Sequence, residues 1–315
     1  MRSAHASSSE YLRVSSQSVL FISEKMRLNR RTRGLGIRWT VGDVSDAGFE
    51  ALQLSIWSAW NLFGENAKYT VCVNTVPLQS AVARIGPLPR GIQWLDTNNL
   101  VPEWLRSYLR KDMAEGVAWK LAPVRVFPNL YELSLDNDVI LWTIPSAVSE
   151  WLISGEADAC LMAADVSPAL GQFSEMCQHR ALNSGIRGVP PGFDLETRLR
   201  RKLARSGIVL RSELDEQGLQ AAVLLDSNLF VVDTDDVSIC SPFPMHQQRL
   251  GRCGAHFVGL NPKRAPWTID GRPAHELIRE RWDAYAGELD RLVWGSHFAN
   301  LWESISDRAP ESVMG

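Results

Sequence analysis

Two carboxylates stand at the end of an apolar run in the stretch YELSLDNDVILW, residues 131–142. Asp136 and Asp138 are two positions apart, so in an extended segment their side chains point to the same side. Two carboxylates held that close repel each other unless a cation lies between them. Oxygen ligands suit Mg²⁺ or Mn²⁺, and such sites often complete their coordination with phosphate oxygens. The pattern predicts a divalent metal site, with helix caps or turn residues as the alternative interpretation.

A second stretch, GAHFVGLNPKRAPW at residues 254–267, carries one histidine, a glycine and a lysine between prolines. Gly259 and Lys263 suit a loop that brings backbone and a cation close to phosphates. His256 could give the same metal a nitrogen ligand, which would favour Mn²⁺ over Mg²⁺. A lone histidine can equally be a hydrogen-bonded structural residue, and the residues alone leave both interpretations open.

The elements that must position these residues alternate between strand and helix from Ile37 onward, which predicts an α/β fold with a largely parallel sheet. The strand that ends at Asp136 would place both carboxylates at the carboxyl edge of that sheet, where open parallel sheets bind ligands. The expected strands are 36–44, 68–74, 91–97, 131–136, 158–166 and 228–233, and the expected helices are 48–64, 101–129 with a break at Pro128, 145–154, 194–207, 216–225 and one or two within 273–306.

Composition narrows the class of protein. The 315 residues are 45% hydrophobic and carry 33 basic against 36 acidic side chains, so no basic field favours nucleic acid. Five scattered cysteines without a CxxC pair indicate reduced thiols and a cytoplasmic location. No window approaches the roughly 20 apolar residues that span a bilayer. We expect a flexible arm at 1–35, one domain at 36–272 and a helical extension at 273–315.

Read in order, several segments resemble the GT-A-fold nucleotide-sugar glycosyltransferases, specifically the retaining, glycogenin-like family (glycosyltransferase family 8-like). WTVGDVSDAGFEALQLSIWSAWNLF is similar to that family's first strand, nucleotide loop and first helix, and WKLAPVRVFPNLYELSLDNDVIL to its basic residue and DXD strand. LNSGIRGVP, LDEQGLQ and HFVGLNPKRAPW resemble its later Asn-Ser/Ala-Gly, Asp-Gln-Asp and His-x-x-Gly-x-x-Lys segments. The resemblance implies a Rossmann-like, mostly parallel central sheet with helices on both faces.

The resemblance also implies roles for individual residues in a hexosyltransferase-type enzyme that uses a nucleotide-sugar, with UDP-sugar expected as the donor. The metal, Mn²⁺ with Mg²⁺ possible, would be bound by Asp136, Asp138 and His256. The donor would contact Asp43, Val44, Lys120, Asn137, Asn183, Ser184, Gly185, Gly259 and Lys263. LDEQG departs from Asp-Gln-Asp, so Asp215, Glu216 and Gln217 are alternatives for the catalytic, sugar-facing position beside Lys263. The donor sugar, the acceptor (sugar, lipid or protein) and the oligomeric state stay open.

Two other functions fit parts of the pattern. A haloacid-dehalogenase-like phosphatase would use Asp136 and Asp138 with a later acidic pair, for which DTDD (Asp233, Asp235, Asp236) is a candidate. That function leaves the stretch 254–267 without a role. A non-catalytic nucleotide-sugar-binding protein would keep the fold and the ligands but transfer nothing.

Overall fold

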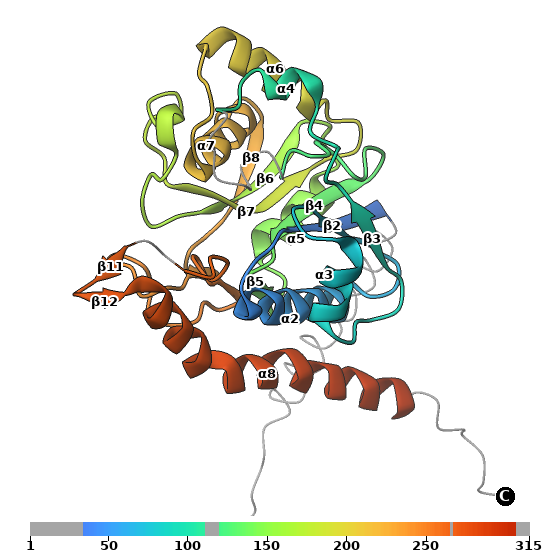
Figure 1. The fold of residues 1–315 in the computed structure, drawn as a ribbon. Coiled ribbons are helices and arrows are strands. Elements are labelled where there is room, and N and C mark those ends of the chain that lie inside the picture. The colour runs from blue at the N-terminus through green and yellow to red at the C-terminus, as the bar shows by residue number, and fades with distance from the viewer. Residues whose placement is uncertain (1–33, 111–119, 265–266, 307–315) are drawn as a thin grey trace, which may run out of the picture.

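The structure is a computed structural model that describes residues 34–110, 120–264 and 267–306, the last eleven of these by backbone alone. A seven-stranded sheet lies at its centre, with helices on both faces (Figure 1). A small three-stranded sheet and the long C-terminal helix α8 (Ala274–Ser306) lie on one side of this body.

The central sheet has the strand order β3-β2-β1-β4-β7-β6-β8. Strand β7 is antiparallel to both of its neighbours, and every other pairing in this sheet is parallel. Strands β1, β4 and β6 therefore end at the same edge, where β7 begins. The bounds are β1 Leu35–Val41, β2 Lys68–Val73, β3 Ile92–Asp96, β4 Tyr131–Asp136, β6 Ala159–Ala164, β7 Leu182–Val189 and β8 Asn228–Val232.

The first face of the sheet packs against α2 (Asp46–Phe63), α3 (Leu78–Ile85) and α5 (Ser146–Ser154). Alternate residues of β1, from Leu35 to Val41, and of β4, Leu133 and Leu135, point into this core. Ser45 caps the N-terminus of α2, because its hydroxyl accepts the Gly48 N–H. Apolar packing on this face holds β1 and β4 in place and so fixes where the two strands end.

The second face packs against α4 (Glu103–Arg106), α6 (Leu195–Ser206), α7 (Glu213–Leu224) and a 3₁₀ turn at Gly171–Phe173. Under α7 the strands are polar: Arg38 on β1, Glu132 on β4 and Arg187 on β7 are all fully buried. The register pairs Arg38 with Ser134 and Ser134 with Arg187, so these side chains share one face. An ionic cluster replaces apolar packing at this position.

The small sheet has the order β5-β10-β9, formed by Val139–Leu141, Gly254–His256 and Val237–Ile239. Helix α8 runs along the outer side of α2, and its Trp282 and Leu289 are buried in the core that α2 and this sheet share (Figure 1). The hairpin of β11 (Thr268–Ile269) and β12 (Arg272–Pro273) directly precedes α8.

Most of the expected elements are present, and the exception is the helix expected over 101–129, of which the structure describes 101–110 and 120–129. Only Glu103–Arg106 is helical there, 120–128 forms turns, and 111–119 lie outside the described residues. Arg125 donates to four main-chain carbonyls, of Pro190, Phe193, Phe127 and Leu130, and Glu132 accepts two main-chain N–H groups. These bonds satisfy the backbone without a helix.

Three further expectations concern the N-terminal arm, the C-terminal helices and membrane spans. The first strand begins at Leu35, the last residue of the expected arm, and the rest of that arm falls outside the described residues apart from Gly34. The C-terminal region forms one helix. None of the helices in the described part of the chain has the length and apolar character needed to cross a bilayer.

Candidate functional site

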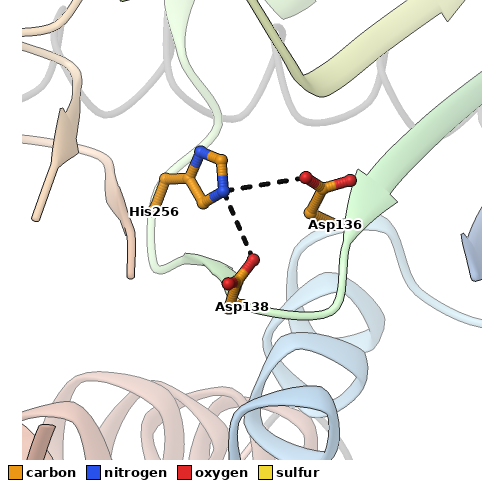
Figure 2. A group of neighbouring side chains, drawn as sticks. All are labelled: Asp136, Asp138 and His256. Atoms are coloured by element: carbon orange, nitrogen blue, oxygen red, sulfur yellow. Dashed lines mark ion pairs between the residues drawn. The ribbon is translucent and has the colours of Figure 1, made fainter. Parts of the chain in front are cut away.

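Asp136, Asp138 and His256 meet at the carboxyl edge of the central sheet (Figure 2). One ligand atom from each lies within 4.8 Å of the others. His256 Nε2 is 3.3 Å from Asp138 Oδ1 and 3.7 Å from Asp136 Oδ2. This is the one group of three or more such side chains in the described ranges that could hold a metal.

The small sheet brings His256 to the two aspartates. Asp136 is the last residue of β4, and Asp138 lies in the turn that leads into β5. Strand β10 pairs with β5 so that His256 is opposite Val139, and Phe257 N–H donates to the Asp138 carbonyl at 2.9 Å. The residue at 185 must be small here, because a Cβ on Gly185 would lie 2.5 Å from the His256 ring.

The donor set fits a divalent cation. Asp138 Oδ1 is buried and accepts no hydrogen bond within the described chain, although a buried carboxylate oxygen ordinarily needs a partner. Burial lowers the pKa of His256, but Asp138 and Asp136 outweigh it, and the pKa is raised. A protonated His256 imidazole would place a positive charge between the two carboxylates when no metal is bound. A metal ion would satisfy the same oxygens and compete with that proton.

Lys120 adds a second cation at this edge. Its Nζ lies 2.7 Å from Asp136 Oδ1 and 2.8 Å from Oδ2, and it also donates to Ser184 Oγ at 3.3 Å. Burial opposes the charge, but attraction to Asp136 and then Glu216 is larger in total, so the pKa of Lys120 is raised. Lys120 therefore keeps its charge at neutral pH.

The start of β7 lines the site beside Lys120. Asn183 donates to Asp165 at 2.8 Å, and its own oxygen accepts the Gly185 N–H at 2.7 Å. Ser184 donates through its N–H to Gln217 Oε1 at 3.0 Å. Sequence reasoning missed Asp165, although it follows β6 as Asp136 ends β4, and the same rule for strand ends could have found it.

The three alternatives on α7 are used differently. Asp215 accepts bonds from the Gln172 backbone and side chain and from the Arg211 N–H, so it joins three segments of the chain. Gln217 bridges Ser184 and the Ala169 carbonyl. Glu216 accepts a bond from Gln220 and lies within the electrostatic reach of Lys120 and Asp136, and burial raises its pKa to about 8.

The expected nucleotide loop contacts the expected phosphate loop. Lys263 Nζ donates to Asp43 Oδ2 at 2.6 Å, and Arg84 lies 3.3 Å from the other Asp43 oxygen. Hydrogen bonding to Lys263 is the main reason that the pKa of Asp43 is lowered. Gly259 has φ +90°, a conformation that favours glycine. Lys263 thus lies on Asp43, and the described contacts do not join it to the two metal-site aspartates.

Val44 and Asn137 hold the same loops in place. The Val44 carbonyl accepts a bond from Arg84 at 3.0 Å. Asn137 and Asn261 exchange two amide hydrogen bonds, at 2.6 and 3.0 Å, and Asn137 also donates to the Gly48 carbonyl. The Asn137 side chain therefore contacts α2 and the 260–263 loop instead of the metal group.

Solved structures with a similar fold include a galactosyltransferase, LgtC, in complex with donor and acceptor sugar analogs. This match has a TM-score of 0.50 at 13% sequence identity, and it covers 79% of this chain and 95% of the LgtC chain. WbbM, a bifunctional glycosyltransferase, has a TM-score of 0.49 at 12% identity, covering 82% and 51%. GlyE of Streptococcus pneumoniae has 0.45 at 14%, covering 89% and 65%.

The sequence itself is less informative in such comparisons. No protein-family model matches the chain, and no curated protein matches it in sequence. The likeness to WbbM and GlyE is weaker, so the fold assignment rests on LgtC, nearly all of whose length is covered, and on the sheet with its aspartates at the end of β4. The chain has the GT-A fold of the glycosyltransferases, a Rossmann-like mixed sheet with helices on both faces.

Proposed function

We propose that this protein is a metal-dependent glycosyltransferase that moves a sugar, with retention, from a nucleotide-sugar, a UDP-sugar, to an acceptor hydroxyl. The observation that carries the proposal is the Asp136, Asp138 and His256 group at the carboxyl edge of a GT-A fold, in which the buried Asp138 Oδ1 accepts no hydrogen bond and has the His256 imidazole, 3.3 Å away, as its ionic partner. Carboxylate oxygens and one imidazole nitrogen suit Mn²⁺, with Mg²⁺ as the alternative.

The chemistry follows from charge. Breaking the anomeric C–O bond places negative charge on the departing diphosphate, and a bound metal would stabilise that charge as a Lewis acid. Lys120 keeps its charge beside Asp136 and would orient the donor there. Lys263 would exchange its exposed partner, Asp43, for a phosphate oxygen, which needs little reorganisation because both side chains are about half exposed.

The residues that border the sugar would come from β7 and α7. Asn183, Ser184 and Gly185 line the edge next to the metal group, and Gln217 holds Ser184 in place. Among the three alternatives on α7, we assign the sugar-facing role to Glu216. Its carboxyl group accepts a bond from Gln220 on the same helix, whereas the Asp215 carboxylate and the Gln217 amide each bond to other segments of the chain.

The phosphatase alternative is not favoured. Its second acidic pair would come from Asp233, Asp235 and Asp236, but Asp235 and Asp236 form ion pairs with Arg249 and Arg252 at 3.4 and 2.8 Å. They are absent from the metal group that the described residues form. The non-catalytic alternative shares the binding site, so turnover must separate it from an enzyme.

The test measures UDP release from a panel of UDP-sugars with Mn²⁺, with Mg²⁺ and with EDTA, beside phosphate release from phosphomonoesters. We expect metal-dependent UDP release that Asp138→Asn abolishes and that Asp235→Asn, an exposed carboxylate outside the group, leaves unchanged. Metal-dependent UDP binding without release or transfer would support the non-catalytic protein. Phosphate release without UDP release would overturn the proposal.

A further inference from the structure

A line of buried polar side chains runs behind the site, from the sheet to α7. Arg187 of β7 lies 3.7 Å from Glu132 of β4 and donates to Gln220 Oε1 at 2.6 Å. Gln220 in turn donates through Nε2 to Glu216 Oε1. The four residues are at most 2% exposed, so each polar contact matters for the fold.

The direction of these hydrogen bonds follows from the side chains. A guanidinium has only donors, so Gln220 must turn its oxygen to Arg187 and its NH₂ group to Glu216. Positions 216 and 220 are one turn apart on the same face of α7, which allows the contact without bending the helix. Glu216 Oε1 is therefore fixed as an acceptor, and Oε2 accepts no hydrogen bond from the part of the chain that the structure describes.

The charges around Glu216 come from four elements. After burial, the strongest influences are Lys120 in the 120–128 segment and Asp136 on β4, followed by Arg187 on β7 and Arg38 on β1. Glu216 is thus influenced electrostatically by residues of both the metal group and the ionic cluster. A neutral carboxyl there can donate a hydrogen bond to a sugar hydroxyl and adds no negative charge beside Asp136.

We propose that Arg187 and Gln220 are positioning residues that hold the Glu216 carboxyl with one oxygen fixed toward the sheet and the other free for a hydroxyl of the donor sugar. This inference rests on the proposed function. It concerns the selection of the sugar, because a buried hydrogen-bonding group rejects a donor that lacks its partner hydroxyl. Neither Arg187 nor Gln220 would touch the substrate.

The experiment measures the pKa of Glu216 by NMR in protein with ¹³C-labelled glutamate carboxyl groups, in EDTA, with Glu216→Gln identifying the signal. Gln220→Leu removes the donor to Oε1 and should raise this pKa by about one unit. Gln220→Glu keeps the volume and the Arg187 bond but cannot donate to an ionised Glu216, so it should raise the pKa in the same direction. Gln172→Leu, which removes an amide bond to neighbouring Asp215, is the matched control and should leave it unchanged.

A second readout separates positioning from a general structural effect. In Gln220→Leu the midpoint of the pH profile of UDP release should move with the pKa, and KM for the donor should rise. The thermal midpoint of the control Gln172→Leu should fall at least as much as the thermal midpoint of Gln220→Leu. An unchanged Glu216 pKa in either Gln220 variant overturns the inference. If the native protein releases no UDP, the proposed function fails, and the NMR result still decides the contact between Gln220 and Glu216.

Discussion

Glu216 should make the stability of this protein depend on pH, and Glu216→Gln should remove that dependence. The side chain is 2% exposed, and its pKa rises from 4.5 to about 8, mainly because of burial. Below pH 4.5 both the folded and the unfolded chain keep the proton. Between pH 4.5 and 8 only the folded chain keeps it, so this group lowers the free energy of unfolding as pH rises.

The size of the effect follows from the shift. Each unit corresponds to about 1.4 kcal/mol, so three and a half units set an upper bound of about 5 kcal/mol above pH 8. Relaxation of the site and water entry reduce that figure, and we expect a measured difference of about 2 to 4 kcal/mol. Glutamine resembles the protonated carboxyl, so the variant should match the native protein near pH 5 and be the more stable of the two at pH 9.

Urea unfolding at pH 5 to 9 in EDTA measures this, provided that the m-value stays constant between variants. Glu213→Gln is the matched control, because Glu213 is an exposed carboxylate at the start of the same helix and lies outside the buried ionic cluster. A difference between native protein and Glu216→Gln that does not change with pH would refute the reasoning. It would mean that Glu216 is ionised in the folded state at neutral pH.

Three further predictions concern the metal and phosphate contacts. Asp138→Asn should abolish metal-dependent UDP binding in calorimetry while the apo protein keeps its fold, since asparagine has the same size and its oxygen can still accept a hydrogen bond from His256. Retained metal-dependent affinity would contradict the ligand role. Mn²⁺ affinity should fall as pH drops through the pKa of His256, which is raised above 6.5. His256→Ala should lose both this pH dependence and the preference for Mn²⁺ over Mg²⁺. A destabilised variant with an unchanged metal preference would indicate a structural histidine. Lys263→Ala should change the free energy of unfolding by less than about 1 kcal/mol, because the ion pair of Lys263 with Asp43 is exposed. The same variant should lower kcat more than it weakens donor binding. Full activity would exclude Lys263 from the site.

The local spacing of apolar residues predicted most helices and strands, because this spacing depends only on which side of each element is buried. The apolar alternation in β1 and β4 and the helical spacing in α2 each require one partner surface, whichever segment supplies it. The helix expected over 101–129 is the exception in its described parts, 101–110 and 120–129. In the second part, two main-chain N–H groups donate to Glu132, and Arg125 donates to the Phe127 carbonyl and to carbonyls that follow β7.

The candidate site likewise has features that the sequence predicted and contacts that it did not. The spacing of Asp136 and Asp138 after an apolar strand was enough to place both at the edge of a sheet. Sequence alone could not show that Lys263 pairs with Asp43, because the two are 220 positions apart. It also left Asp215, Glu216 and Gln217 equivalent, since three consecutive polar residues differ only in what surrounds each side chain.

By itself, the sequence determined most of the strand and helix types and the two carboxylates at a strand end, which depend on residue type and short spacing. The tertiary structure decided which charges are buried together. Glu132, in the alternating stretch YELSL, has the pattern of a solvent-facing residue, yet Arg38, Arg125 and Arg187 converge on it from other segments. Burial of a charge depends on partners brought by the whole chain, and no local spacing encodes them.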